Sequence, residues 1–369
     1  MNVLWVTNMP TIYRVDFFNE LGNYCDLQVV FERYSATGIK NRWSDKLAKN
    51  FNFSFLNTRK FGREGSFSLG LLNINFKKYD LIVISSYSSP TEMLLILKLL
   101  LFKQKFFLAV DGGVIKKENF LKKIVKQTFI GNAHWWLSTS NKTDDYLKYY
   151  GANSKKIFRY PFTSFNKADL LPKIPTQQEK IIFRQRLGME DKHIILCVGQ
   201  FIHRKGIDTL INSAKYLDDS IGIYIIGGEP TKEFTILVDS LQLNNIYFED
   251  FKSKEELADY YKAADLFVLP TREDIWGLVI NEALAHALPV ITTNKCIAGL
   301  ELIEDGKNGY IISPDDPETL ANRIKAILGE PSLKQEMSSK SFNKIQDYTV
   351  ENMAETHYKV FKEVLKNQE

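Results

Sequence analysis

Short apolar segments recur along the chain in two series, with polar stretches of helix length between them. The first series comprises residues 3–7, 27–31, 51–56, 81–85, 106–110 and 135–138, and the second comprises 194–198, 221–226, 246–248, 266–269, 290–293 and 310–312. Continuous apolar segments rich in valine and isoleucine are typical of strands covered on both faces, and their alternation with helices favours a parallel sheet. The pattern therefore predicts an α/β protein with two doubly wound domains and a cleft between them.

The boundaries of these domains follow from the polar stretch 160–192, which separates the two series. It contains three prolines among polar residues and is typical of a linker followed by a helix. We therefore place the first domain at residues 1–165 and the second at 166–350. The tail, 351–369, carries apolar residues at helical spacing among charges, which predicts a helix with one apolar stripe. The stripe has to pack on something, and we expect the helix to return to the first domain.

The composition is that of an ordinary globular protein with more than one domain. The 369 residues are too many for one core, and 44% of them are hydrophobic and 25% charged. The net charge of +4 is too small to indicate a nucleic-acid partner, but it is compatible with an anionic ligand or membrane surface. The scattered cysteines and the five histidines show no metal-binding spacing, so we predict no metal site. A chain that starts directly with a strand predicts a cytoplasmic protein without a signal peptide.

Ligands of doubly wound sheets bind beyond the carboxyl ends of the strands, so the strand-to-helix loops are the informative places. Residues 265–289 run from an apolar strand through a short acidic loop into a helix that Gly277 opens. The amides at a helix start attract anions, and phosphate is the usual one. The amides near Gly277 and Leu278 are therefore candidates for binding a phosphate group.

Three carboxylates surround this helix start. Glu273 and Asp274 precede it and can bind a sugar ring, whereas Glu282 lies about one and a half turns inside the helix and can reach ribose hydroxyls. A phosphate-binding site next to carboxylates that accept hydrogen bonds from hydroxyl groups suits a nucleotide sugar. For Asp274 a simple helix cap that favours the macrodipole stays open as the alternative.

A second loop supplies positive charge. Residues 198–206, which include Arg204, Lys205 and Gly206, end a strand and precede an apolar helical pattern. Arginine offers a planar fork and lysine a point charge, so the pair can neutralise a diphosphate at the carboxyl edge of the sheet. A solvated surface turn is the alternative. No GxGxxG follows any of the apolar segments, which argues against a nicotinamide enzyme.

Two loops of the first domain are expected at the same kind of edge. Arg14 follows the first strand, where it can meet donor phosphates or an anionic acceptor. Asp111 follows a later strand, where it can accept a proton or orient an acceptor hydroxyl. Ordinary loop charges are the alternative for both residues.

The segment 116–129 is predicted to form a basic amphipathic helix. Its five lysines fall largely opposite an apolar face made of Phe120, Leu121, Ile124, Val125 and Thr128. Such a helix can lie on an anionic membrane, which would make the protein peripheral on the inner face of the cell membrane. The alternative is a helix that packs its apolar face into the core and leaves its lysines in solvent.

These motifs, in this order, resemble family 4 of the retaining glycosyltransferases, which have the GT-B fold. The resemblance rests on Arg204-Lys205-Gly206, residues 264–271, Trp276-Gly277-Leu278, Asn281-Glu282-Ala283, Glu301, residues 305–310 and the tail 350–354. It implies two Rossmann-like domains that face a cleft, with the donor held mainly by the second and the terminal helix crossing back to the first. It further implies that Lys205 clamps the diphosphate and that Glu282 binds the ribose. Gly277 and Leu278 would form the phosphate-binding helix start, without a bound metal.

Several positions depart from the family pattern. The family pairs two glutamates with seven residues between them, whereas the first of the pair is Asp274 here, with Glu273 just before it. Gln200 takes the place of an arginine usual in the clamp motif, which leaves Arg204 as its replacement. In the first domain a glycine pair is missing, and Asp111 lies where a histidine is often seen.

The sequence therefore predicts a metal-independent, retaining glycosyltransferase of the hexosyltransferase type, in bacterial-type surface polysaccharide or glycoconjugate assembly. It would move a sugar from a nucleoside diphosphate, with a UDP-sugar favoured over a GDP-sugar, to a hydroxyl of a glycan or lipid-linked glycan. No cofactor is expected. Two alternatives stay open: a nucleotide-sugar epimerase of the same fold, and a catalytically silent protein that binds a nucleotide sugar or a partner transferase.

Overall fold

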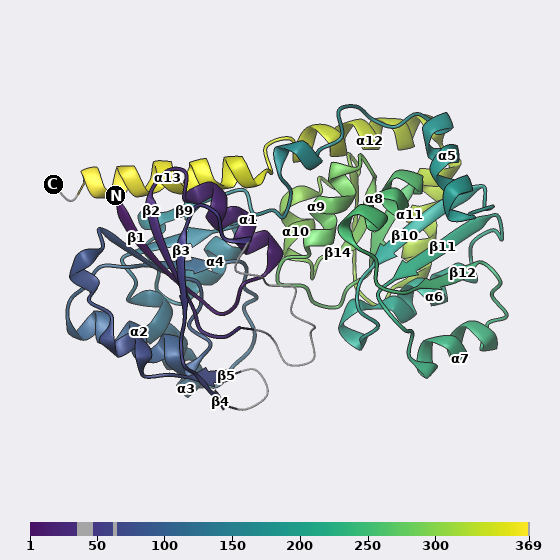
Figure 1. Cartoon of the computed structure of the whole chain (residues 1–369). Coiled ribbons are helices and arrows are strands. Elements are labelled where there is room, and N and C mark those ends of the chain that lie inside the picture. The colour runs from purple at the N-terminus through teal and green to yellow at the C-terminus, as the bar shows by residue number, and fades with distance from the viewer. Residues whose placement is uncertain (35–46, 62–64, 368–369) are drawn as a thin grey trace. The chain divides into compact units, whose positions relative to one another are not determined.

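The computed structural model describes residues 1–34, 47–61 and 65–367. The chain forms two compact units (Figure 1), which we call unit 1 (Met1–Lys167 with Tyr348–Glu369) and unit 2 (Ala168–Asp347). Each unit is built on a parallel sheet, which confirms the predicted α/β class. No helix in the described part of the chain combines the length and the apolar character needed to cross a membrane.

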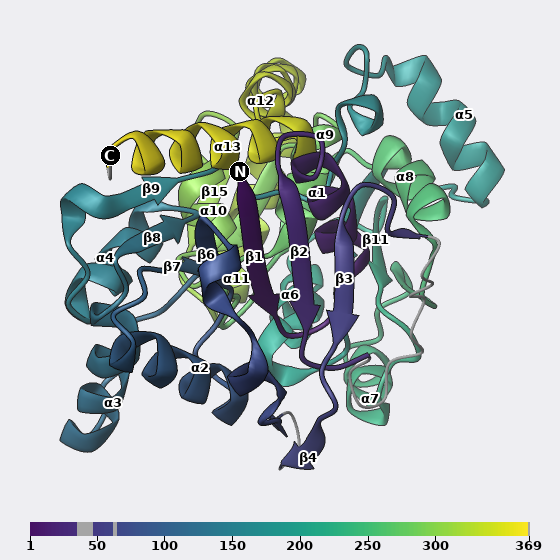
Figure 2. The ribbon, with the colours of Figure 1, turned by 60° about the vertical axis from the view of Figure 1, so that its left-hand side comes forward.

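Unit 1 contains a seven-stranded sheet in the order β3-β2-β1-β6-β7-β8-β9. Its strands are β1 (Asn2–Thr7), β2 (Asp26–Phe31), β3 (Asn52–Phe55), β6 (Leu81–Ile84), β7 (Phe107–Val110), β8 (Trp135–Ser138) and β9 (Ile157–Arg159). All neighbours pair in parallel, and Figure 2 shows β1, β2 and β3 side by side. The edge strand β9 was not predicted, because three residues with an arginine at the end are too short a signal. A separate antiparallel pair joins β4 (Arg59–Phe61) to β5 (Gly65–Phe67).

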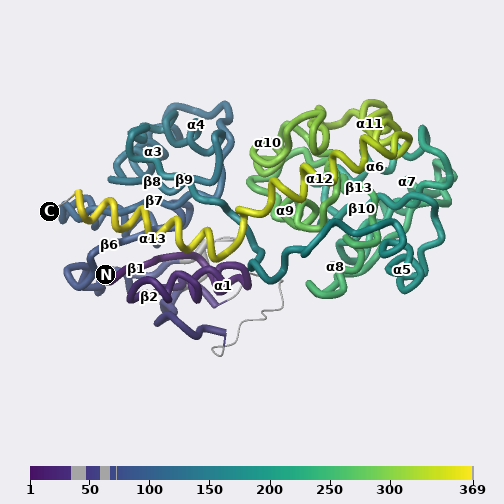
Figure 3. Tube along the Cα trace, turned by 90° about the horizontal axis from the view of Figure 1, so that it is seen from above, coloured from purple at the N-terminus to yellow at the C-terminus, as the bar shows by residue number. Residues whose placement is uncertain are grey.

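The helices of unit 1 include the predicted return helix. They are α1 (Ile12–Leu21), α2 (Pro90–Leu101), α3 (Phe120–Gly131), α4 (Asn141–Tyr149) and α13 (Val350–Lys366), with short 3-10 turns η2 (Gly70–Asn73), η3 (Phe76–Lys78) and η4 (Ser154–Lys156). The C-terminal helix α13 packs against α1, as Figures 1 and 3 show, and it buries Met353, Val360, Phe361 and Val364. The apolar stripe of the tail therefore has its partner in unit 1, as expected.

His357 of α13 packs against α1 and the residue that follows β9. Its ring centroid is 4.4 Å from that of Tyr160 and 4.8 Å from that of Phe17, and its Nδ1 lies 2.7 Å from the Met353 carbonyl oxygen. Burial lowers the pKa of His357 to about 4, against the small opposing effect of that hydrogen bond. The folded state therefore keeps this imidazole neutral.

This buried imidazole predicts acid sensitivity of unit 1. Because a histidine in the unfolded chain has a pKa of about 6.5, the unfolded state binds more protons below that pH, and the free energy of unfolding falls as the pH drops towards 4. We expect the His357 ring protons to titrate with a midpoint near 4 by NMR. In a His357→Leu variant this part of the acid sensitivity should be missing. A midpoint near 6.5 for His357 would contradict the burial argument.

Unit 2 contains a six-stranded sheet in the order β12-β11-β10-β13-β14-β15. Its strands are β10 (His193–Val198), β11 (Ile221–Ile226), β12 (Ile246–Glu249), β13 (Leu266–Leu269), β14 (Val290–Thr293) and β15 (Gly309–Ile312). Its helices are α5 (Gln177–Leu187), α6 (Ile207–Ala214), α7 (Lys232–Ser240), α8 (Lys254–Ala263), α9 (Leu278–Ala285), α10 (Ile297–Leu302), α11 (Pro317–Gly329) and α12 (Pro331–Ile345), with 3-10 turns η5 (Lys167–Asp169, at the unit boundary) and η6 (His203–Lys205). Every strand of this sheet coincides with a predicted apolar segment.

The strand order reverses once in each sheet. In unit 2 the chain passes from β10 to β11 and β12 on one side, and then returns to β13 on the other side of β10. In unit 1 the same reversal lies between β1 and β6. Ligands of open α/β sheets bind at such switch points, beyond the carboxyl ends of the strands. The loops after β10 and β13 are therefore the first place to look for a site in unit 2.

Candidate functional site

Hydrogen bonds tie the loops after β10 and β13 to each other. Thr271 donates from its hydroxyl to the carbonyl oxygens of Arg204 (2.9 Å) and Glu273 (3.1 Å). The Arg204 guanidinium donates back to the Glu273 carbonyl oxygen (2.8 Å), and the Arg272 amide donates to the Arg204 carbonyl oxygen (2.9 Å). The backbone of both loops is thus fixed without a ligand.

Arg272, which sequence reasoning missed, also fixes these loops through hydrogen bonds. Its guanidinium donates to both carboxylate oxygens of Asp208 (2.8 and 2.6 Å), to Asp315 (2.7 Å) and to the His203 carbonyl oxygen (2.6 Å). Burial would raise the pKa of Asp208, but the hydrogen bonds and charge of Arg272 hold it below its usual value. Because these partners are distant in sequence, no local pattern could have singled out this arginine.

Lys205 and Asp274, both predicted from the sequence, form an ion pair in this place. Lys205 Nζ donates to Asp274 Oδ2 at 2.6 Å, and the two side chains are only 13% and 12% exposed. Arg204 Nη1 lies 3.7 Å from the other carboxylate oxygen. One carboxylate therefore faces two cations, which leaves an excess of positive charge. An ammonium has three N–H donors, so the bond to Asp274 leaves Lys205 able to bind an anion as well.

The start of α9 completes this group of residues. Gly277 has φ 100°, and a Cβ there would lie 2.9 Å from Cys296 Sγ and 3.6 Å from Asp274 Oδ2. Only glycine accepts this conformation and this closeness without strain. The N-cap residue of α9 is Gly277, which has no side chain to accept a hydrogen bond from the first amides of the helix. We call Arg204, Lys205, Asp274 and Gly277 the switch-point cluster.

Gly206 and Leu278, also predicted as binding residues, have different surroundings. Gly206 has φ 66°, and a Cβ there would lie 2.1 Å from the Pro270 carbonyl oxygen. Gly206 is thus needed for the close approach of the basic loop to the end of β13. Leu278 is the first residue of α9 and carries one of the amides at the helix start.

Glu282 projects from the second turn of α9 towards α8. It accepts a hydrogen bond from the Tyr261 hydroxyl (2.9 Å), and the buried Tyr261 ring stacks on His286 with centroids 5.0 Å apart. Burial raises the pKa of Glu282, and the bond from Tyr261 opposes this shift. Sequence reasoning missed Tyr261, since only the packing of α8 on α9 brings it to this carboxylate.

In unit 1 the structure brings together the two residues predicted from separate loops. Arg14 Nη2 pairs with Asp111 Oδ2 at 3.0 Å, and its Nη1 donates to the Thr7 hydroxyl at 2.6 Å. The Tyr160 hydroxyl donates to the other oxygen of Asp111 (3.1 Å). Arg14, Asp111 and Tyr160 line a cavity of about 20 Å³ together with His357, which is room for about one water molecule. The charge of Arg14 is thus balanced within unit 1.

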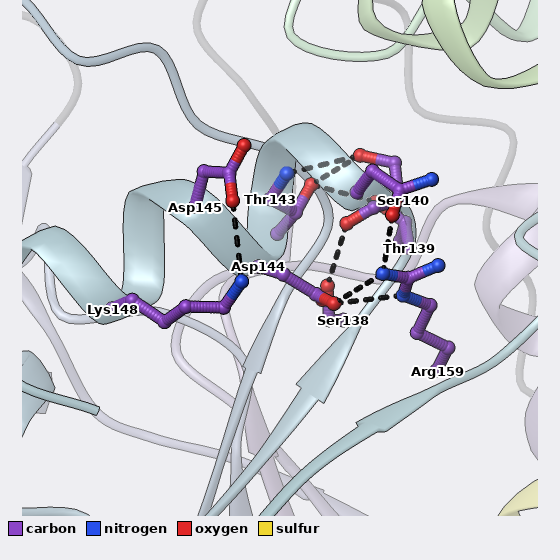
Figure 4. Close-up of polar contacts among 9 residues, drawn as sticks. Ser138, Thr139, Ser140, Thr143, Asp144, Asp145, Lys148 and Arg159 are labelled. Carbon is purple, nitrogen blue, oxygen red and sulfur yellow. Dashed lines mark hydrogen bonds and ion pairs between the residues drawn. The ribbon is translucent and has the colours of Figure 1, made fainter. Parts of the chain in front are cut away.

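The neighbouring loop, after β8, supports the Asp111 loop. The Thr139 hydroxyl donates to the Asp111 carbonyl oxygen (3.0 Å) and hydrogen-bonds the Thr143 hydroxyl (3.1 Å). Figure 4 shows this turn, with Arg159 of β9 donating twice to Asp144 on the same helix, at 2.8 and 2.6 Å. The loop after β8, which carries no predicted site residue, thus holds the backbone of Asp111 through Thr139.

The cysteines and histidines do not gather into a metal centre. In the described ranges, no three His, Cys, Asp or Glu side chains lie together as metal ligands would. Cys197 and Cys296 are buried, and burial raises the pKa of each thiol to about 12.

The match to a known family lies in unit 2. Residues 178–344 match the family model described as glycosyl transferases group 1. D-inositol 3-phosphate glycosyltransferase of Xylanimonas cellulosilytica is 26% identical over 211 residues, which are 55% of this chain and 50% of that protein. Lipopolysaccharide glucosyltransferase WaaG of Escherichia coli is 27% identical over 203 residues, which are 53% of each protein. The chain spans about half the length of the curated relatives it matches.

The similarity of fold extends over the whole chain. The crystal structure of Anabaena Alr3699/HepE in complex with UDP has a TM-score of 0.78 and 15% sequence identity, and the match covers 100% of this chain and 99% of that chain. Both predicted parallel-sheet domains are thus found in a solved structure of matching extent. Residues 178–344 are therefore similar to the glycosyl transferases group 1, in a chain that has the two Rossmann-like units of the GT-B fold.

Proposed function

We propose that this protein is a retaining glycosyltransferase that moves a sugar from a nucleoside diphosphate sugar to an acceptor hydroxyl. The observation that carries the proposal is the switch-point cluster. It gathers two cations, one carboxylate and the start of α9 at one edge of the unit 2 sheet, inside the segment that matches the family model. A diphosphate fits such a seat, because positive side chains and helix-start amides both attract it.

The chemistry of the reaction matches this distribution of charge. As the sugar leaves, the diphosphate gains negative charge, and Lys205, Arg204 and the first amides of α9 are placed to stabilise it. Groups that are fixed beforehand stabilise a transition state most, and the bonds of Thr271 and Arg272 fix these loops. The positive charge that the reaction needs is then supplied by the chain itself, which supports the proposed metal independence.

The carboxylates accept hydrogen bonds from the hydroxyl groups of the donor. We assign Asp274, rather than Glu273, to the sugar ring, since its carboxylate lies between Lys205 and Gly277. Glu282 binds the ribose hydroxyls, with Tyr261 holding the carboxylate in place. Retention follows from front-face attack, in which an oxygen of the leaving phosphate takes the proton of the acceptor. In unit 1, Asp111 is the proposed acceptor-side group.

The names of the similar proteins support a donor and a cellular role. The complex of HepE with UDP supports a UDP-sugar over a GDP-sugar as donor. The similarity to WaaG, a lipopolysaccharide glucosyltransferase, supports an acceptor in surface glycoconjugate assembly. We accordingly propose a cytoplasmic protein that works at the inner face of the cell membrane on a glycan or lipid-linked glycan.

A turnover assay with a panel of nucleotide sugars and simple glycan acceptors tests this function. We expect one donor to release its nucleoside diphosphate in proportion to the sugar transferred, with mass spectrometry identifying the product. An epimerase would change the sugar without a proportional release of nucleotide. A silent binding protein would gain thermal stability with a nucleotide sugar but show no turnover. Either result would overturn the proposal.

Replacing Glu282 by alanine should weaken the donor site without unfolding the protein. The loss of a hydrogen-bonding carboxylate should lower kcat/KM for the donor by about 100-fold, which is expected when buried hydroxyls lose their partner. Glu336 on α12, an exposed residue of the same unit, provides the matched control, and Glu336→Ala should leave kcat/KM unchanged. The melting temperature should stay near that of the wild type in both variants. Wild-type kinetics of Glu282→Ala would refute the assigned role.

A further inference from the structure

Helix α3 packs on unit 1 with its apolar face towards solvent. Its buried residues are Phe129 and Ile130 near the C-terminal end. The apolar residues of the first two turns are Phe120, Leu121, Ile124 and Val125, and all four are exposed. Phe120 and Leu121 are 75% and 72% exposed. The structure therefore contradicts the alternative in which this apolar face packs into the core.

Part of the basic face of α3 points into the fold instead. Lys126 Nζ pairs with Glu118 at 2.9 Å and donates to the Tyr150 hydroxyl at 3.2 Å. Lys123 Nζ lies 4.6 Å above the Tyr149 ring, within the range of a cation–π contact. These contacts with α4 and with the segment before α3 fix the rotation of the helix about its axis. Specific contacts within unit 1 thus keep the apolar face of α3 directed outwards.

The residues before α3 continue the same character. Ile115, Lys116 and Lys117 are exposed, and so is Lys122 on the first turn of the helix. The stretch 115–128 holds five lysines and one glutamate, a formal charge of +4 that equals the net charge of the whole chain. We call Ile115, Lys116, Lys117, Phe120, Leu121, Lys122, Ile124 and Val125 the α3 surface.

The chemistry of the α3 surface selects one kind of partner. Protein interfaces are depleted of lysine, whereas helices that lie in a membrane interface combine lysines with phenylalanine and leucine. Long lysine side chains can reach anionic headgroups while apolar neighbours enter the acyl region. At about 18 Å, α3 is too short to cross a bilayer and suits an orientation in its plane.

We propose that the α3 surface docks unit 1 on a membrane that contains anionic lipids. Phe120, Leu121, Ile124 and Val125 enter the boundary between headgroups and acyl chains, and Lys116, Lys117 and Lys122 contact anionic headgroups. This surface would place the proposed glycosyltransferase at the membrane. The biological purpose of docking rests on the proposed function, but the docking itself does not. Vesicle binding is measured without a donor, so failure of docking and failure of turnover are separate results.

Co-sedimentation of the full chain with vesicles tests the proposal. We expect binding to phosphatidylcholine vesicles that contain phosphatidylglycerol, and weak binding to phosphatidylcholine alone. The double substitution Phe120→Ser with Leu121→Ser should lower the fraction bound to anionic vesicles by about tenfold, because both side chains lose their burial in lipid. The triple substitution of Lys116, Lys117 and Lys122 by Gln should remove most of the preference for anionic vesicles.

Matched controls keep the test specific to this surface. Ile236 is 63% exposed on α7 of unit 2, and Ile236→Ser should bind like the wild type. The triple change of Lys325, Lys340 and Lys366 to Gln removes as much charge from exposed positions elsewhere and should also leave binding intact. All replaced residues of the α3 surface are exposed, so melting temperatures should not change. Equal binding of the Phe120/Leu121 variant and the wild type would overturn the proposal. So would a wild-type chain that ignores anionic vesicles but self-associates through these residues in sedimentation velocity.

Discussion

Replacing Lys205 by alanine is expected to lower kcat/KM for sugar transfer by about 10²–10³-fold, the usual cost of removing one preorganised group that stabilises charge in a transition state. Lys205 is the least exposed cation of the switch-point cluster and lies 2.6 Å from Asp274. Because the charge on the diphosphate grows as the sugar leaves, the effect should fall on kcat as well as on KM. Steady-state kinetics with the identified donor measure both.

Two further variants separate a lost clamp from an unbalanced carboxylate. In Lys205→Ala the Asp274 carboxylate keeps, among the cations of the described residues, only Arg204, 3.7 Å away, as a partner. If that imbalance caused the loss, the double variant Lys205→Ala with Asp274→Asn would recover the affinity for UDP, which carries no sugar for Asp274 to bind. We expect no recovery of UDP affinity, since the double variant still lacks the cation. Lys325→Ala, at an exposed position of α11, is the matched control and should keep wild-type kinetics. Wild-type turnover of Lys205→Ala would remove the basis of the assignment.

Replacing Asp265 by alanine should destabilise unit 2 by about 3–5 kcal/mol, the range found when a buried ion pair loses one partner. Asp265 is fully buried and pairs with Arg184 (2.7 Å) and Lys334 (3.0 Å), with Lys180 3.8 Å away. It also accepts a hydrogen bond from the Ile194 amide (3.1 Å). Its removal would leave the buried Lys180 and Arg184 and the partly buried Lys334 without their counter-ion.

Chemical denaturation of the variant and of a surface control measures this effect. Asp259 pairs with Arg186 at 3.1 Å and is about a quarter exposed, so Asp259→Ala should cost less than about 1 kcal/mol. Burial would raise the pKa of Asp265, but His193 and the nearby cations hold it well below its usual value. This carboxylate therefore stabilises the fold above a pH of about 4, and the contribution is lost only in stronger acid. Equal losses in the two variants would contradict a central role for Asp265.

Much of the fold could be predicted from the sequence, because buried parallel strands leave a strong local signal. Continuous apolar segments marked every strand of unit 2, and the rule that ligands bind beyond strand ends pointed to the loops of Lys205 and Asp274. The short edge strand β9 was missed, since Ile157–Arg159 has only two apolar residues before an arginine, which is too short a signal. Arg272 and Tyr261 were missed because their partners are far away in sequence.

The orientation of α3 shows another limit of sequence patterns. Helical periodicity places Phe120 and Leu121 on one face and most of the lysines on another, and this assignment is correct. It does not say which face meets the protein. The contacts of Lys126 with Glu118 and Tyr150 determine which face of α3 meets the protein. They turn Lys126 inwards and leave Phe120 outside. The outcome depends on residues of two other segments, which the periodicity of α3 alone does not encode.

We propose that the switch-point cluster holds a diphosphate by its own positive charge. Calorimetric titration of the wild type and Lys205→Ala with UDP and with uridine, in buffer that contains EDTA, measures the contribution of that charge. We expect UDP to bind the wild type at least about 100-fold more tightly than uridine, because uridine lacks the diphosphate that accepts charge-assisted hydrogen bonds. Most of that difference in affinity should vanish in Lys205→Ala. Equal affinities for UDP and uridine in the wild type, or an undiminished difference in Lys205→Ala, would contradict the account.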